Sequence, residues 1–126
     1  MHILFIADPL EHFKISKDTT FAMMREAARR GHTLSACEPQ HMHWQRGGKA
    51  MARTRAITLT GDATNWYRAS AVQESELSSF DAVLMRKDPP FDSEYFYATH
   101  LLAQAEREGA KVFNKPAALR EHAEKL

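Results

Sequence analysis

Three charged residues, Arg86-Lys87-Asp88, follow directly after a short apolar segment, Asp81–Met85. The segment is too short for an amphipathic helix, and its composition predicts a buried strand. The two prolines after Asp88 cannot continue that strand, because proline has no N–H group for the sheet ladder. Open α/β sheets bind ligands at the carboxyl ends of their strands. The pattern therefore favours a binding crevice in which Arg86 binds a carboxylate, and the alternative is a solvated turn.

A second group of polar residues precedes the first predicted helix. The apolar run Ile3–Ala7 ends at Asp8, and a polar loop then leads to Lys17, Asp18 and Thr19. Aspartate and threonine are typical N-cap residues. The free amide groups and positive dipole end of a helix N-terminus attract anions. If the two predicted strands are parallel neighbours, these groups meet the charged triplet at one edge of the sheet.

Hydrophobic periodicity predicts the elements that position these groups. The continuous apolar run near the N-terminus is typical of a strand buried on both faces. Glycine after an amphipathic stretch is a typical helix stop. The predicted strands are at 3–7, 33–38, 81–85 and 111–113. The first predicted helix begins at 18 and ends at Gly31, with the buried stripe Phe21, Met24 and Ala28. The second runs from Asp92 or Ser93 to Glu108 with the stripe Tyr95, Ala98, Leu102 and Ala105, and the third runs from Pro116 to Leu126. Alternating strands and helices predict an α/β fold with a mostly parallel sheet.

The middle of the chain has a different pattern. Met42–Gln45 and Met51–Leu59 flank a Gly-Gly pair, which predicts a β-hairpin inserted into the α/β fold. Its second strand alternates Arg53, Arg55 and Thr58 with Ala52, Thr54 and Ile57, so one face is predicted to be exposed. Residues 61–76 are polar and predict no regular element, although Trp66 and Tyr67 are expected to anchor them by packing.

Composition excludes several classes of protein. Seventeen basic and sixteen acidic residues among 126 leave a formal charge of +1, which favours neither nucleic acid nor an anionic membrane as partner. The apolar run near the N-terminus is too short for a signal peptide or a membrane span. A lone cysteine, Cys37, predicts a core residue and a reducing cytoplasm. His41 and His43 share a strand face but have no third ligand at suitable local spacing, so no metal site is predicted.

Four stretches of the sequence together resemble a known family. They are Asp8-Pro9, KDTTFAMMREAARRGH at 17–32, MRKDPPFDSEYFYATHLL at 85–102 and NKPAALREHAEKL at 114–126. Their order and the specific RKDPPFD element resemble the N-terminal domain of bacterial glutathione synthetase, an ATP-grasp ligase. Residues 34–51 depart most from that pattern.

The resemblance implies a fold and a reaction. Residues 1–126 would form a Rossmann-like pre-ATP-grasp domain on the substrate side of the enzyme, and the ATP-grasp domains would be absent from this chain. The full-length enzyme would use ATP and Mg²⁺ (or Mn²⁺) to activate the carboxylate of γ-glutamylcysteine, and glycine's amine would then attack to give glutathione. No glycine-rich phosphate loop occurs in this sequence. The chain alone is therefore expected to be inactive and to bind no cofactor.

A dipeptide substrate with two carboxylates and one amine requires both cationic and anionic partners. Arg86 would bind one carboxylate, and the amides from Asp18 through Thr19 to Phe21, with Lys17, would bind another. Asp8 or Asp88 would bind the ammonium group. Each residue also has a structural alternative: an internal ion pair for Arg86, solvation for Lys17, a helix cap for Asp18 and a turn for Asp88.

A second hypothesis is a stand-alone module that binds a small acidic metabolite or mediates assembly without catalysis. The last predicted helix reaches the final residue without a stop signal, which predicts that the protein continues. A domain separated from its partners is expected to expose an apolar patch and to form a homo-oligomer. Sequencing the gene beyond Leu126 would distinguish the two hypotheses.

Overall fold

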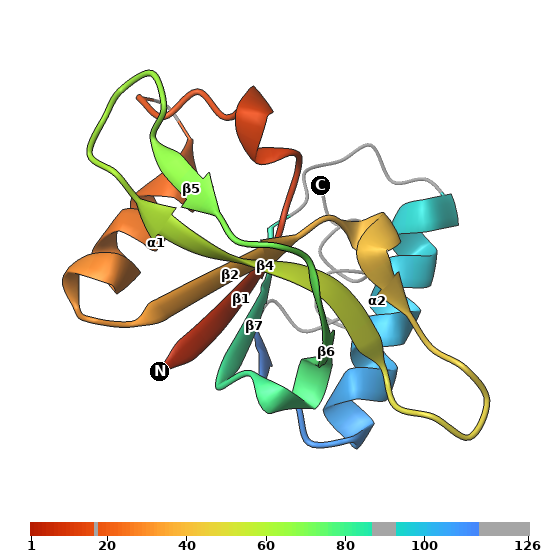
Figure 1. The fold of residues 1–126 in the computed structure, drawn as a ribbon. Helices are drawn as coiled ribbons and strands as arrows, with labels where there is room; N and C mark the ends of the chain where they lie inside the picture. The colour runs from red at the N-terminus through yellow and green to blue at the C-terminus, as the bar shows by residue number, and fades with distance from the viewer. Residues whose placement is uncertain (17, 87–92, 114–126) are drawn as a thin grey trace.

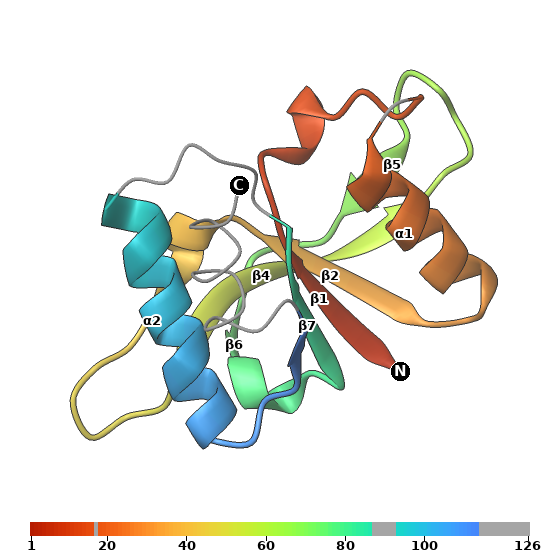
Figure 2. The same ribbon diagram turned by 180° about the vertical axis from the view of Figure 1, so that it is seen from behind.

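The structure, a computed structural model, describes residues 1–16, 18–86 and 93–113, the last range with side chains from residue 97 onward. A mixed sheet lies between two helices, with one helix on each side (Figures 1 and 2). The predictions for Lys17, Asp88, the Asp92 cap, the Tyr95 side chain and the helix at 116–126 lie outside the described parts.

Strand β1 (His2–Ile6) is at the centre of the parallel half of the sheet. It pairs with β2 (Thr33–Cys37) on one side and with β7 (Ala82–Met85) on the other, and both pairings are parallel. Strand β8 (Val112–Phe113) pairs in parallel with β7. These elements agree with the predicted α/β class. They also bring the carboxyl ends of β1 and β7 to the same edge, as the site hypothesis requires.

The other half of the sheet is antiparallel and is organised by β4 (Met51–Leu59). This strand pairs with β2 and with β3 (Met42–His43), which confirms the predicted hairpin. It also pairs with β5 (Tyr67–Ala69) and β6 (Gln73–Glu76). The predicted mostly parallel sheet is thus partly antiparallel. The connection from β2 to β4 contains a one-turn 3₁₀ helix, β3 and a loop but no crossover α-helix, and a parallel pairing needs a crossover.

Helices α1 (Thr19–Arg29) and α2 (Ser93–Arg107) cover opposite faces of the sheet. Successive side chains of a strand point to opposite faces, and β1 uses both. Ile3 and Phe5 belong to the core cluster that includes Met24 of α1, whereas Leu4 and Ile6 belong to the cluster that includes Leu102 of α2. The double coverage explains why β1 reads as a continuous apolar run.

The ends of α1 follow the predicted capping chemistry. Asp18 accepts hydrogen bonds at Oδ1 from the amides of Thr20 (2.8 Å) and Phe21 (3.3 Å), which makes it the N-cap. Gly31 adopts a φ of 85° after the helix, a conformation that strains any side chain with a Cβ. The Asp18 cap fixes where the helix begins, and its first turn therefore lies at the carboxyl edge of the sheet.

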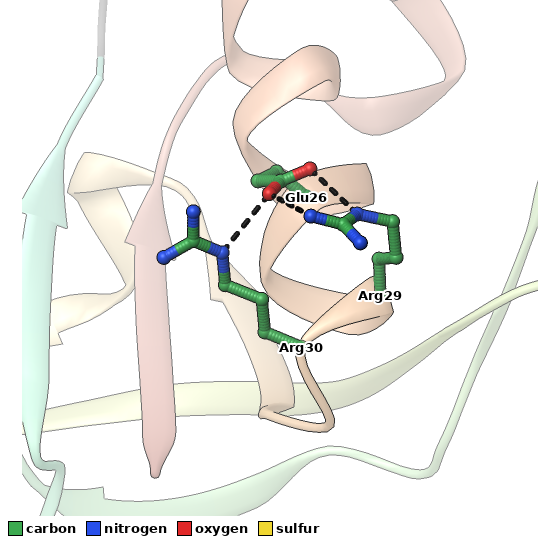
Figure 3. Close-up of polar contacts among 3 residues, drawn as sticks. All are labelled: Glu26, Arg29 and Arg30. Atoms are coloured by element: carbon green, nitrogen blue, oxygen red, sulfur yellow. Dashed lines mark hydrogen bonds and ion pairs between the residues drawn. The ribbon is translucent and has the colours of Figure 1, made fainter.

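The exposed face of α1 carries a small charge network (Figure 3). The Glu26 carboxylate accepts hydrogen bonds from Arg29 at 2.6 and 3.0 Å and from Arg30 at 2.9 Å. The Arg25 side chain is also exposed, and its guanidinium lies 5.6 Å from the centre of the Phe21 ring. These three arginines therefore form a solvated face of the helix.

Residues 61–76 contain regular structure that the sequence did not predict. Strands β5 and β6 both pair with β4, and Trp66 anchors the segment as expected, with an exposed fraction of 6%. Its indole contacts the rings of Phe13, Phe21 and Tyr67 at centroid distances of 5.5, 5.0 and 4.6 Å. Three short 3₁₀ helices complete the described elements: η1 (Leu10–His12), η2 (Pro39–His41) and η3 (Leu77–Ser79).

Candidate functional site

The carboxyl ends of β1, β2 and β7 meet at one edge of the sheet. The amide of Ala7 donates to the Cys37 carbonyl at 3.0 Å, and the amide of Arg86 donates to the Ile6 carbonyl at 2.7 Å. The backbone ladder therefore continues to the last residue of each strand. Asp8 and Arg86 leave the sheet next to each other for this reason.

Arg86 reaches from the end of β7 to the start of α1. Its Nε lies 3.4 Å from Oγ1 of Thr20, a long hydrogen bond, and the threonine side chain is buried. The arginine side chain is half-buried. Among the described residues, no ion pair holds its guanidinium, so the structural alternative of an internal ion pair is absent there. The guanidinium is therefore held beside the α1 N-terminus.

The first turn of α1 has one amide group to offer to a ligand. The Asp18 side chain occupies the amides of Thr20 and Phe21, so the helix-cap interpretation of Asp18 is confirmed. The Asp18 amide donates to the Lys14 carbonyl at 2.9 Å. Within the described part of this turn, the amide of the exposed Thr19 has no protein acceptor. An anion at this end would bind there and to the Arg86 guanidinium.

Asp8 is half-buried and lies on the same edge, at the border of a cavity. This pocket has a volume of about 510 Å³ and extends over β2 and β4, away from Arg86. Residues of β2, β4 and β5 and of the segments that follow β1, β2 and β5 line it: Asp8, Leu10, Glu11, Ala36, Cys37, Glu38, His41, Arg53, Arg55, Ile57, Tyr67, Ala69 and Val72. We call it the β2–β4 pocket. Of the predicted site residues that the structure describes, Asp8 alone borders this pocket.

Sequence reasoning did not identify the β2–β4 pocket. The alternation of Arg53 and Arg55 with buried residues correctly predicted an exposed face. It did not show which other segment would oppose that face, because the pairing of β4 with β2 joins residues far apart in the sequence. A charged run on an exposed strand face is a weak signal without that pairing.

Cys37 lies at the end of β2, where it lines the pocket and is 8% exposed. Burial raises the pKa of its thiol to about 12, and the neighbouring Glu38 carboxylate adds to the shift. The thiol is therefore protonated at neutral pH and is not a nucleophile. This agrees with its predicted role as a core residue.

The two histidines of the hairpin region have partners that compete with a metal. His41 Nδ1 accepts from the Glu38 amide at 3.1 Å, and His43 Nε2 lies 3.4 Å from the Glu74 carboxylate. Within the described residues there is no group of three or more metal-ligating side chains.

No described helix combines the length and the apolar character that crossing a bilayer requires.

Comparison with known proteins agrees with the resemblance in the sequence. A family model for the N-terminal domain of prokaryotic glutathione synthetase matches residues 1–120. A glutathione synthetase of Ralstonia nicotianae is 54% identical over 126 residues, which cover 100% of this chain and 39% of the relative. One of Nitrosomonas europaea is 49% identical and one of Bordetella pertussis 47%, each over 100% of this chain and over 40% and 41% of the relative. The chain thus spans about two fifths of the length of these curated relatives.

Proposed function

Because the chain belongs to the family of prokaryotic glutathione synthetase N-terminal domains, we propose that it forms one wall of the peptide-substrate site of an ATP-dependent ligase. The full-length gene product would join γ-glutamylcysteine to glycine. The chain's own part is to bind and orient the dipeptide at the carboxyl edge of its sheet. The remaining three fifths or so of a relative's length would carry the other substrates.

One observation supports the site more than any other. Two segments that are 66 residues apart in sequence meet where Arg86 Nε approaches Thr20 Oγ1. A fixed guanidinium beside a helix N-terminus suits a carboxylate, since both groups donate hydrogen bonds and carry positive charge. Arg86 and the Thr19 amide would bind a carboxylate of the dipeptide, and Asp8 would bind its ammonium group. Lys17 and Asp88, outside the described residues, remain proposed members of the site.

ATP and Mg²⁺ (or Mn²⁺) belong to other parts of the proposed enzyme. The described residues offer no cluster of metal-ligating side chains, and the sequence contains no glycine-rich phosphate loop. The residues present therefore do not fit a metal–nucleotide site, and we assign no chemical step to them. We further propose a cytoplasmic homo-oligomer without a nucleic-acid or membrane partner, in keeping with the near-neutral charge and single cysteine.

The proposed role of Arg86 is tested by substitution in the full-length gene product. Calorimetric titration should show that Arg86→Ala binds γ-glutamylcysteine at least about tenfold more weakly than the wild type does, because a charge-assisted hydrogen bond to the substrate carboxylate is lost. Arg46→Ala is the matched control, since Arg46 is exposed in the β3–β4 loop and far along the chain from the site. Equal affinities of wild type and Arg86→Ala would remove Arg86 from the substrate site.

A further inference from the structure

The β2–β4 pocket contains opposite charges that do not pair with each other. Among the described residues, neither the Arg55 guanidinium nor the Glu11 carboxylate has a hydrogen-bond or ion-pair partner, although both line this pocket. Arg53, the other guanidinium of the pocket, is held by Glu74 at 3.2 Å. Arg55 is therefore the cation that the protein leaves available to a ligand, and Glu11 is an available anion.

The two charges reach the pocket from different elements. Arg55 projects from β4, which is hydrogen-bonded to β2 through the Ala36–Arg55 register. Glu11 belongs to η1, which follows β1, and Asp8 and Glu38 bring further carboxylates from the strand ends. In the sheet, β2 separates β4 from β1. The pocket thus has a guanidinium wall on β4 and a carboxylate wall on the segments after β1 and β2.

The remaining lining of the pocket is largely apolar. Side chains of Leu10, Ala36, Ile57, Ala69 and Val72 contribute to it, and the volume of about 510 Å³ lies in the range of small-molecule sites. A simple anion would face three carboxylates, and a simple cation would face Arg55. A molecule that carries both charges on an uncharged body satisfies both walls and covers the apolar surface.

We propose that the β2–β4 pocket binds a small zwitterion, an amino acid or dipeptide with an uncharged side chain, with its carboxylate on Arg55 and its ammonium group on Glu11. The site differs from the proposed Arg86 site, because neither Arg86 nor any residue of α1 lines it, and the two sites adjoin at Asp8. It does not depend on the proposed ligase activity.

The ligand class is tested with three matched compounds and the full-length gene product. L-Leucine carries both charges, 4-methylpentanoate lacks the ammonium group, and 3-methylbutylamine lacks the carboxylate. Titration followed by calorimetry or amide NMR should show saturable binding of L-leucine, and both analogues should bind at least tenfold more weakly. L-Alanyl-L-leucine tests the dipeptide. Absence of saturable binding by both zwitterions, or equal binding of the two analogues and L-leucine, would overturn the proposal.

Matched variants place the ligand in the pocket. Arg55→Gln should weaken L-leucine binding at least tenfold, while Arg68→Gln should leave it unchanged, since Arg68 is exposed on β5 between two pocket residues but does not line the pocket. Glu11→Gln should also weaken binding, with exposed Glu76→Gln as its control. Circular dichroism confirms that each variant is folded. Unchanged binding in Arg55→Gln would overturn the proposal.

The same variants separate this site from the proposed ligase site. Arg55→Gln should bind γ-glutamylcysteine like the wild type, and Arg86→Ala should bind L-leucine like the wild type. Loss of L-leucine binding in Arg86→Ala with normal binding in Arg55→Gln would assign the zwitterion to the proposed Arg86 site and refute the second site. If the γ-glutamylcysteine titration alone failed, the proposed ligase site would be contradicted and the result for L-leucine would still stand.

Discussion

Individual side chains in this protein differ in whether their surroundings favour the charged or the neutral form. Glu26 is exposed and its pKa is lowered by Arg29 and Arg30, whereas Cys37 is buried and its pKa is raised. Arg86 lies between these two cases: it is half-buried, and within the described part of the chain its side chain makes one long hydrogen bond, to Thr20. A side chain with an incomplete set of partners retains donors for a ligand, which is why Arg86 and Arg55 are the cations tested above.

The Cys37 thiol should resist modification in the folded protein. With its pKa raised to about 12 from 9.0, the thiolate fraction at about pH 8 falls roughly a thousandfold. The reaction with Ellman's reagent should be slow in buffer and fast in denaturant. Cys37→Ala supplies the blank, because it is the one cysteine in the sequence. Rapid labelling of the folded protein would show that the thiol is neither buried nor protonated as described.

Glu26 should make a small contribution to stability that depends on pH. Hydrogen bonds from Arg29, and then from Arg30, lower its pKa in the folded state from 4.5 to about 2. The contribution is therefore complete above about pH 4.5 and is lost as the pH falls toward 2. Urea unfolding should find Glu26→Gln less stable than wild type at neutral pH, with a difference that shrinks on acidification. Exposed Glu76→Gln should show a smaller difference, and a larger one would contradict this assignment.

At the level of elements, Trp66 holds an otherwise polar segment against the sheet. Its indole is 6% exposed and packs on three aromatic rings, while Trp44 in the β3–β4 loop is 40% exposed. Trp66→Ala should therefore lower the free energy of unfolding by about 3–5 kcal/mol, as is typical of a buried large-to-small change. Trp44→Ala should cost much less. Chemical denaturation measured by circular dichroism compares the two, and similar losses would show that Trp66 is no anchor.

The sequence predicted the elements whose patterns are local. The apolar run of β1, the Asp18 cap and the Gly31 stop each lie within a few residues of the element they define, and the structure contains all three. Strands β5 and β6 were not predicted, because their own residues are mainly polar. They are strands because they hydrogen-bond to the edges of β4, and that depends on chain segments outside the local window.

The position of Arg86 at the edge of the sheet could be predicted for the same reason, and its contact with a substrate stays a prediction. Arg86 directly follows a recognisable strand, and parallel pairing of β7 with β1 places it beside the first loop. The Arg55 pocket depends on an antiparallel pairing that the sequence does not specify locally. Charged residues at strand ends therefore carried more information than charged residues along a strand.

For the whole molecule, catalysis should require the part of the protein beyond the matched domain. The family model that covers residues 1–120 describes an N-terminal domain, and the relatives are about two and a half times as long as this chain. The 126-residue chain alone should therefore release no phosphate from ATP with magnesium, γ-glutamylcysteine and glycine. The full-length gene product is the positive control. Magnesium-dependent turnover by the isolated chain would refute the division of labour proposed here.

The central place of β1 has a consequence for synthesis on the ribosome. The β1 strand emerges first, yet its partner β7 is far along the chain: His2 and Asp81, whose amide and carboxylate are hydrogen-bonded, are 79 residues apart. At translation rates of about 5–20 residues per second, the nascent strand waits roughly 4–16 s with the backbone N–H and C=O groups of one edge unpaired. During that interval a holdase chaperone would find exposed the apolar side chains of Ile3–Ile6, which the finished domain buries.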